Sequence, residues 1–308
     1  MVVDDSAVVR GLITRMLEED PGFSVVASVG NGQMALSALE RHAVEVVVLD
    51  IEMPVMDGLT ALPQLLKADP DLQIIMASTL TLKNADISLR AMEAGAADYI
   101  PKPTSSREIA GVSGGTNDFK RDLLSKVRAL AAARRRRPRR PGAPAPAPLP
   151  TAVSSAGAAA SSPAHHPVAP TPAARPVAAP ISLRTAASET PEVIAIGSST
   201  GGPQALFTVL GALKAGSLRQ PIFITQHMPA TFTTILAEHI SRISGWEAAE
   251  GKEGEVVRSN RIYIAPGDFH MVVENKGTEK VIRLNKNPPE NFCRPSVDPM
   301  LRSISAIW

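Results

Sequence analysis

The sequence predicts an α/β protein with two domains, each built on a parallel β-sheet, joined by a disordered linker. Short apolar runs alternate with segments of helical periodicity in both halves of the chain, as they do in doubly wound sheets. Between the halves, from residue 138 to about 191, the composition collapses to Ala, Pro and Ser. A chain of 308 residues has room for two domains, because a domain usually takes ~100–200 residues.

The composition narrows the functional classes. A single cysteine, Cys293, excludes an intramolecular disulfide and every multi-cysteine metal pattern, and it favours a reducing compartment. Met1 leads into the acidic pair Asp4 and Asp5, with no basic segment and no long apolar run. We therefore expect a cytoplasmic protein with no signal peptide and no membrane insertion. The net charge of +2 is too small to imply a polyanionic partner by itself.

The N-terminal half alternates strands and helices. Apolar runs predict strands at Met1–Val3, Phe23–Val29, Val44–Leu49, Ile74–Ala77 and Asp98–Ile100. Helical spacing predicts helices over Val8–Leu17, Met34–Leu39 and Leu89–Ala94. This order implies a doubly wound sheet, whose functional site lies at the carboxyl ends of the strands.

Five polar residues fall at those strand ends: Asp4, Asp5, Asp50, Ser78 and Lys102. Any one of them alone would more simply be a solvated residue, but five in register favour a site. Three converging carboxylates repel each other, and a Mg²⁺ ion relieves that repulsion through oxygen ligands. Asp50 can then attack a phosphoryl group, with Lys102 as counter-charge and the Ser78 hydroxyl as hydrogen-bond donor.

The segments VVDDS, VVVLDIEMPVMDG, IIMAS and ADYIPKP resemble the receiver domain of bacterial response regulators, from Met1 to about Ser106. The resemblance implies a flavodoxin-like fold for residues 1–106. It also implies that Asp50 takes phosphate from a histidine kinase.

The same resemblance assigns roles to further residues. The resemblance implies that Mg²⁺ is held by Asp4, Asp5, Asp50 and the backbone carbonyl of Glu52. Within this set, Asp5 and Asp50 are the expected metal ligands. Tyr99 matches the aromatic that changes rotamer on phosphorylation; a half-buried strand tyrosine is an equally good interpretation.

Residues 107–190 are expected to form the linker. Apolar residues recur at helical spacing from Phe119 to Leu130, which predicts one amphipathic helix over about 118–133. The Ala/Pro-rich remainder cannot bury enough apolar surface to fold. We expect the pair His165 and His166, which lies within it, to have no specific role.

An arginine cluster follows the predicted helix, at Arg134–Arg137, Arg139 and Arg140. Such a cluster can bind nucleic acid or an anionic membrane surface. Because no aromatic residues interleave with it, a solvated linker is the favoured interpretation.

The second domain opens on VIAIGSSTGG. Val193–Ile196 predicts a buried strand, and the turn after it matches G-x-S-x-G, a pattern that exposes a serine on a sharp strand-to-helix bend. Ser199 is therefore a candidate nucleophile. An ordinary loop or a phosphate cradle at a helix N-terminus is the alternative. A helix over about Gln204–Leu213 and a strand over Pro221–Thr225 should follow.

His227 is the candidate base. It follows the second strand, where neighbouring parallel strands would place it beside Ser199, and a neutral imidazole can take a hydroxyl proton near pH 7. A strand-end histidine that only caps backbone groups is the simpler alternative. His270 is the one serious competitor, whereas His42 and His239 sit in helical patterns and are expected to be exposed.

The segments AIGSSTGGP, ITQHMP, YIAPGDFHM and RPSVD resemble the catalytic domain of the chemotaxis protein-glutamate methylesterases, the CheB family. The resemblance implies a Rossmann-like catalytic domain over residues 191–308, with Ser199 as nucleophile, His227 as base and no cofactor. It implies phosphorylation-activated hydrolysis of glutamate γ-methyl esters on chemoreceptors, which releases methanol, and deamidation of receptor glutamines.

One departure from the family pattern stands out. The family's triad acid lies in a segment of the form T-G-M-G-x-D-G, which this sequence does not contain. The chain stops at Trp308 within a helical pattern, so we expect a C-terminally incomplete catalytic domain that is nearly inactive. Asp298 matches a different family segment; we expect it to start a helix and do not assign it as the triad acid.

Two hypotheses follow for the whole chain. In the first, the unphosphorylated receiver covers the cleft of Ser199 and His227, and phosphorylation of Asp50 releases it. The alternative is a response regulator whose output domain binds a nucleotide or nucleic acid without catalysis. Gly197–Gly202 fits neither G-x-G-x-x-G nor a Walker A motif, so the esterase hypothesis is preferred and no nucleic-acid partner is expected.

Overall fold

The computed structural model describes residues 1–79, 81–102, 115–136, 190–213 and 215–308. Most of the predicted linker, with Arg137, Arg139, Arg140, His165 and His166, lies outside these residues. The described residues before and after the linker belong to one compact unit. Among the described helices, none combines the length and the apolar character that crossing a membrane requires.

The first domain has a five-stranded parallel sheet in the order β2-β1-β3-β4-β5. Its strands are β1 (Val2–Val3), β2 (Ser28–Val29), β3 (Val46–Asp50), β4 (Gln73–Ser78) and β5 (Asp98–Pro101). Its helices are α1 (Ala7–Glu18), α2 (Gly32–Leu39), α3 (Gly58–Ala68), α4 (Leu82–Glu93) and α6 (Gly115–Arg136). The predicted fold class is confirmed for this half.

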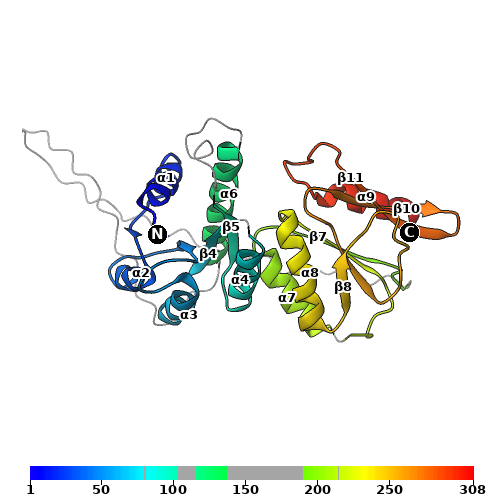
Figure 1. The fold of residues 1–308 in the computed structure, drawn as a ribbon, viewed down its shortest axis with the longest axis horizontal. Coiled ribbons are helices and arrows are strands. Elements are labelled where there is room, and N and C mark those ends of the chain that lie inside the picture. The colour runs from blue at the N-terminus through cyan, green and yellow to red at the C-terminus, as the bar shows by residue number, and fades with distance from the viewer. Residues whose placement is uncertain (80, 103–114, 137–189, 214) are drawn as a thin grey trace, which may run out of the picture. The chain divides into compact units, whose positions relative to one another are not determined.

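Strand residues alternate between two cores. Val2, Val48 and Ile75 pack with α1 and α6 on one face, while Val3 and Leu49 pack with α2, α3 and α4 on the other. Figure 1 shows α1 and α6 on one side of this sheet and the other three helices opposite. The alternation explains why the strand sequences are apolar throughout.

The predicted strand over Phe23–Val29 is shorter than expected, because only Ser28 and Val29 pair with β1. Phe23 and Val25 instead pack against the core beneath α1 and α6. The apolar run therefore reflects burial of side chains along an irregular segment and not a full strand.

The amphipathic helix expected at 118–133 is α6, and it packs against the first domain. Phe119, Leu123 and Val127 are buried among residues of the receiver-like sheet. At its end, Arg134 pairs with Asp69 and Arg135 with Glu45, at N to O distances of 2.7 and 2.5 Å. These two arginines thus form ion pairs with acidic residues of the first domain. The exact limits of the predicted domains stay a prediction.

The second domain has a four-stranded parallel sheet in the order β6-β7-β9-β8. Its strands are β6 (Ile194–Ser198), β7 (Ile222–Gln226), β8 (Glu247–Glu250) and β9 (Arg261–Ile264). Helices α7 (Gly202–Ala212) and α8 (Ala230–Ser244) cover one face. The other face is covered by the hairpin of β10 (His270–Lys276) and β11 (Glu279–Asn285) and by α9 (Val297–Ile307).

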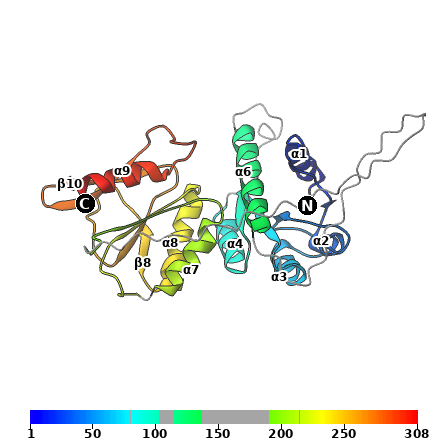
Figure 2. The same cartoon turned by 180° about the vertical axis from the view of Figure 1, so that it is seen from behind.

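Figure 2 shows this layered arrangement from behind, with α9 and β10 on the side of the sheet away from α7 and α8. The central strands separate the two layers because their side chains alternate. Ile222 and Ile224 face α7 and α8, whereas Phe223 and Tyr263 stack on each other beneath the hairpin, with ring centroids 5.2 Å apart. The predicted α/β class is confirmed here as well.

Candidate functional sites

The acidic residues of the first domain meet at the carboxyl end of its sheet. One carboxylate oxygen from each of Asp4, Asp5 and Asp50 lies within 4.8 Å of the others. The Lys102 Nζ lies 2.7 Å from Asp4 Oδ2 and 2.6 Å from Asp50 Oδ1. The structure thus brings together the charged residues that the sequence placed at strand ends.

Burial and charge oppose each other in this cluster. Burial raises the pKa of Asp50, and the Lys102 ammonium only partly offsets the increase. Burial alone would lower the pKa of Lys102, but its hydrogen bonds and ion pairs with Asp4 and Asp50 raise the pKa overall. A hard divalent cation suits this oxygen donor set, with Asp5 exposed and Asp4 and Asp50 buried.

The loop after β3 approaches Asp50 closely. A Cβ atom at Gly58 would lie 2.0 Å from the Asp50 carbonyl oxygen, so only glycine fits at that position. Glu52 is exposed, and its backbone N–H donates to the Asp50 carboxylate. A ligand role for the Glu52 carbonyl stays a prediction.

Ser78 and Tyr99, for which the sequence predicts roles beside Lys102 in the response to phosphorylation, are both buried. The Ser78 hydroxyl lies 3.1 Å from that of Ser88, and Ser88 donates to the Asn84 carbonyl at 2.7 Å. Ser78 therefore donates to Ser88 in this structure. Tyr99 is 2% exposed and thus fully buried, and its ring stacks on Phe232 of α8 with centroids 4.2 Å apart.

Ser199 and His227 follow directly after two hydrogen-bonded strands. Ser198 pairs with Gln226 in the β6–β7 register, and the His227 N–H donates to the Ser198 carbonyl at 3.3 Å. The Ser199 side chain is exposed, and the His227 side chain reaches solvent while the surrounding protein partly desolvates its ring. Gly201 adopts φ of 73°, a left-handed conformation that glycine tolerates, and it is the N-cap of α7. The predicted adjacency of the two loops is what the structure shows.

The remaining histidines have other partners. His270 is buried, with Nδ1 accepting from the Ser296 N–H at 3.2 Å and Nε2 lying 3.1 Å from the Pro288 carbonyl. Both ring nitrogens are thus engaged by backbone groups, so His270 has a structural role. His42 is exposed as expected.

The expectation that His239 is exposed is wrong. It is 2% exposed, pairs with the Glu93 carboxylate through Nε2, and lies beside the Phe207 ring, 4.8 Å between centroids. Its Nδ1 is 2.7 Å from an Arg242 nitrogen. Helical periodicity could not indicate this burial, because Glu93 comes from the first domain.

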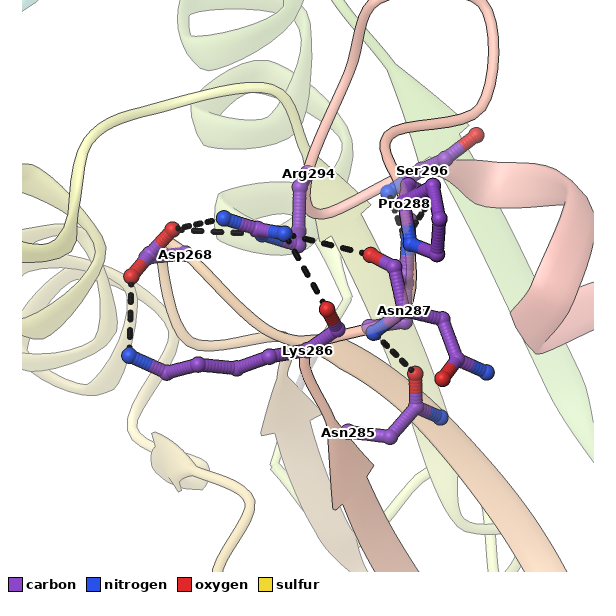
Figure 3. A network of polar contacts seen from close by, with 8 residues as sticks. Asp268, Asn285, Lys286, Asn287, Pro288, Arg294 and Ser296 are labelled. Carbon is purple, nitrogen blue, oxygen red and sulfur yellow. Dashed lines mark hydrogen bonds and ion pairs between the residues drawn. The ribbon is translucent and has the colours of Figure 1, made fainter.

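The motifs YIAPGDFHM and RPSVD meet in the polar network of Figure 3. Arg294 reaches Asp268 at 2.7 Å and also donates to the carbonyls of Lys286 and Asn287 (3.2 and 3.1 Å). The Lys286 ammonium completes the network on the other Asp268 oxygen at 3.1 Å. The network fixes the chain after β11 against the loop before β10.

Asp298 lies in the first turn of α9, as expected for a residue that starts a helix. Its carboxylate accepts a hydrogen bond from the Asn291 side chain at 2.9 Å. This hydrogen bond explains the position of the Asp298 side chain, and no role beside His227 is needed to explain it.

Residues of the first domain also contact the Ser199 turn. The Asp98 carboxylate is buried and accepts a hydrogen bond from the Gly201 N–H at 3.3 Å. Lys126 of α6 lies 3.5 Å from the same carboxylate and donates to the Tyr99 carbonyl at 2.6 Å. Burial raises the pKa of Asp98, and the Lys126 charge opposes that shift. Neither residue stands out in the sequence as a candidate for the site.

Comparison with known proteins agrees with this division. Residues 1–112 match the response regulator receiver domain, and residues 194–308 match the CheB methylesterase domain. A protein-glutamate methylesterase/protein-glutamine glutaminase of Paramagnetospirillum magneticum is 66% identical over 310 residues, covering 100% of this chain and 77% of the relative. A Rhodospirillum rubrum protein of the same name is 60% identical over 309 residues, covering 100% and 76%. Because these matches span both domains at high identity, the chain belongs to the CheB family of protein-glutamate methylesterases/protein-glutamine glutaminases.

Proposed function

We propose that this protein hydrolyses glutamate γ-methyl esters on chemoreceptors, deamidates receptor glutamines, and is activated by phosphorylation of Asp50. The observation that carries the proposal is the placement of Ser199 and His227 after paired parallel strands, within residues that match the CheB methylesterase domain. We further propose a chemotaxis histidine kinase as phosphodonor and the cytoplasm as location. The alternative of a non-catalytic output domain is not favoured by the family match.

The chemistry follows from the two side chains. His227 accepts the Ser199 hydroxyl proton while Oγ attacks the ester carbonyl carbon. The tetrahedral intermediate collapses, methanol leaves with the proton held by His227, and a glutamyl-serine ester remains. Water activated by His227 then attacks that ester, which releases the glutamate carboxylate and restores Ser199. With a glutamine substrate, the first leaving group is ammonia.

Contacts of the first domain at the esterase turn support phosphorylation control. Asp98 accepts a hydrogen bond from Gly201, two residues after the nucleophile, and Tyr99 stacks on Phe232. Both residues belong to β5, the strand that ends beside Lys102 and the Asp50 cluster. We infer that the unphosphorylated protein, in which these contacts are present, restrains the esterase, and that a phosphoryl group on Asp50 alters these contacts.

The acidic cluster would hold Mg²⁺ through Asp5 and Asp50, with Asp4 nearby. The ion, when bound, would neutralise charge on the incoming phosphoryl group. Lys102, already 2.6 Å from Asp50, would form an ion pair with the phosphorylated side chain. No cofactor is proposed for the esterase domain.

The function is tested by methanol release from receptor-containing membranes methylated beforehand, using the natural full-length protein with and without a small phosphodonor. We expect release in both conditions and a faster rate with the phosphodonor. Absence of methanol would contradict the esterase proposal, and equal rates would contradict control by phosphorylation.

The pH dependence of the reaction should report the state of His227. Desolvation by the surrounding protein lowers the pKa of His227 from 6.5. The negative charge of Asp122 raises this pKa, and the positive charge of Lys126 lowers it. Because the base must be neutral, a lowered pKa keeps it active at more acidic pH. We expect the acidic limb of kcat/KM for methanol release to have its midpoint below pH 6.5; a midpoint at or above 6.5 would contradict this assignment.

A further inference from the structure

We propose that Gln226 is a positioning residue that ties the Ser199 turn to the His227 loop through its side-chain amide. The inference rests on the proposed function of Ser199 and His227 and adds a residue that touches neither reacting atom. Gln226 ends β7 and is 2% exposed. A buried amide at that position needs hydrogen-bond partners, and it finds them on both loops.

The amide makes three hydrogen bonds. Its Oε1 accepts from the Ser198 hydroxyl at 2.7 Å, and its Nε2 donates to the Ser199 carbonyl at 3.1 Å and to the His227 carbonyl at 3.4 Å. A glutamine is the right side chain because it presents an acceptor and two N–H donors on one rigid plane. The two loops that carry nucleophile and base thus share one buried group.

The surrounding backbone is shaped for this amide. A Cβ atom at Gly202 would lie 2.1 Å from Gln226 Oε1 and 2.8 Å from the Ser198 Cβ, so a side chain there would displace the amide. The Gly202 N–H donates to the Ser199 carbonyl at 2.7 Å, which makes that carbonyl oxygen an acceptor for both groups. The glycine after G-x-S-x-G therefore makes room for the group that fixes the turn.

Small errors in the placement of a nucleophile are costly. A displacement of about 1 Å at a reacting group can lower a rate by ~10²-fold. The amide of Gln226 limits such displacement because moving either loop alone breaks a hydrogen bond to a side chain that is itself buried.

The test compares three variants of the natural full-length protein. In Gln226→Glu the carboxylate keeps the bond from Ser198 but loses both donors, and it faces two carbonyl oxygens. Ser198→Ala removes only the hydroxyl. The matched control is Gln220→Glu, which removes a donor to the Pro191 carbonyl (2.8 Å) at the other end of β7.

We expect Gln226→Glu to lower kcat for methanol release by ~30–100-fold with KM changed less than threefold, in line with a misplaced nucleophile. Ser198→Ala should lower kcat by only about 3–10-fold, because both donors to the loop carbonyls remain. Gln220→Glu should behave like the wild type.

Hydrogen exchange gives a readout independent of activity. Backbone amides of residues 199–202 and 227–228 should exchange faster together in Gln226→Glu, with the β9 amides unchanged. Unchanged exchange in both loops, or equal loosening of the entire sheet, would overturn the proposal. A wild-type protein that releases no methanol, combined with faster exchange confined to the two loops in Gln226→Glu, would reject the esterase function and retain the tether.

Discussion

Replacing Ser199 by alanine should lower methanol release by the natural full-length protein at least ~10⁴-fold, since loss of a serine nucleophile costs about 2 × 10⁶-fold in a well-studied hydrolase. The Ser199 side chain is exposed on the turn before α7 and makes no side-chain hydrogen bond among the described residues. Its removal therefore leaves no buried polar group without a partner. We expect the melting temperature to stay close to that of the wild type.

The neighbouring serine provides the control for this experiment. Ser198→Ala removes a hydroxyl one residue earlier on the same turn, and its loss of rate should stay within about tenfold because only the bond to Gln226 disappears. Labelling by an active-serine reagent should be lost in Ser199→Ala and retained in Ser198→Ala. If Ser199→Ala still releases methanol at a comparable rate, the nucleophile has been assigned to the wrong residue.

The residues at the strand ends could be predicted because the neighbouring sequence alone indicates where each strand ends. Each of Asp50, Ser199 and His227 follows an apolar run, and the parallel order of the strands determines which loops become neighbours. The structure brings Asp4, Asp5 and Asp50 together with Lys102 for this reason. Catalytic and metal-binding roles for these residues stay proposals.

Contacts between distant segments were not predictable in the same way. His239 has the periodicity of a surface helix, yet a carboxylate and an aromatic ring bury it. The apolar stripe of α6 indicated a helix but not the sheet that it covers. The sequence does not indicate the β10–β11 hairpin, because its exposed end is charged, from Glu274 to Lys280, and its apolar side chains face α9.

Polar side chains that join two loops are the hardest to predict. Gln226 stands in ITQHMP as one more polar residue after a strand, and nothing in its sequence context tells a buried amide from a solvated one. Its role emerges only from the partners Ser198, Ser199 and His227. Tyr99 is similar, since its buried ring stacks on Phe232 of the second domain.

Replacing Asp50 by asparagine should abolish both phosphoprotein formation and the stimulation of methanol release by a small phosphodonor. The variant removes the carboxylate that attacks the phosphoryl group. The asparagine amide has nearly the same size, so it fills the same space beside Lys102. Phosphoprotein is measured on a phosphate-affinity gel, and stimulation is the ratio of methanol release with and without the phosphodonor. Asp86→Asn is the matched control, because Asp86 pairs only loosely with Arg90 on the surface of α4, at 3.9 Å.

Chelation of divalent cations should have the same effect on the wild type. Without a cation, Asp4, Asp5 and Asp50 repel an anionic phosphodonor, and the single positive charge of Lys102 cannot balance three carboxylates. Added Mg²⁺ should restore phosphorylation in the wild type and in Asp86→Asn, but not in Asp50→Asn. Phosphorylation that persists in chelator would reject the metal site, and phosphorylation that persists in Asp50→Asn would place the acceptor elsewhere. The two experiments are independent, because chelation tests whether phosphorylation needs the cation, whereas Asp50→Asn tests which residue accepts the phosphoryl group.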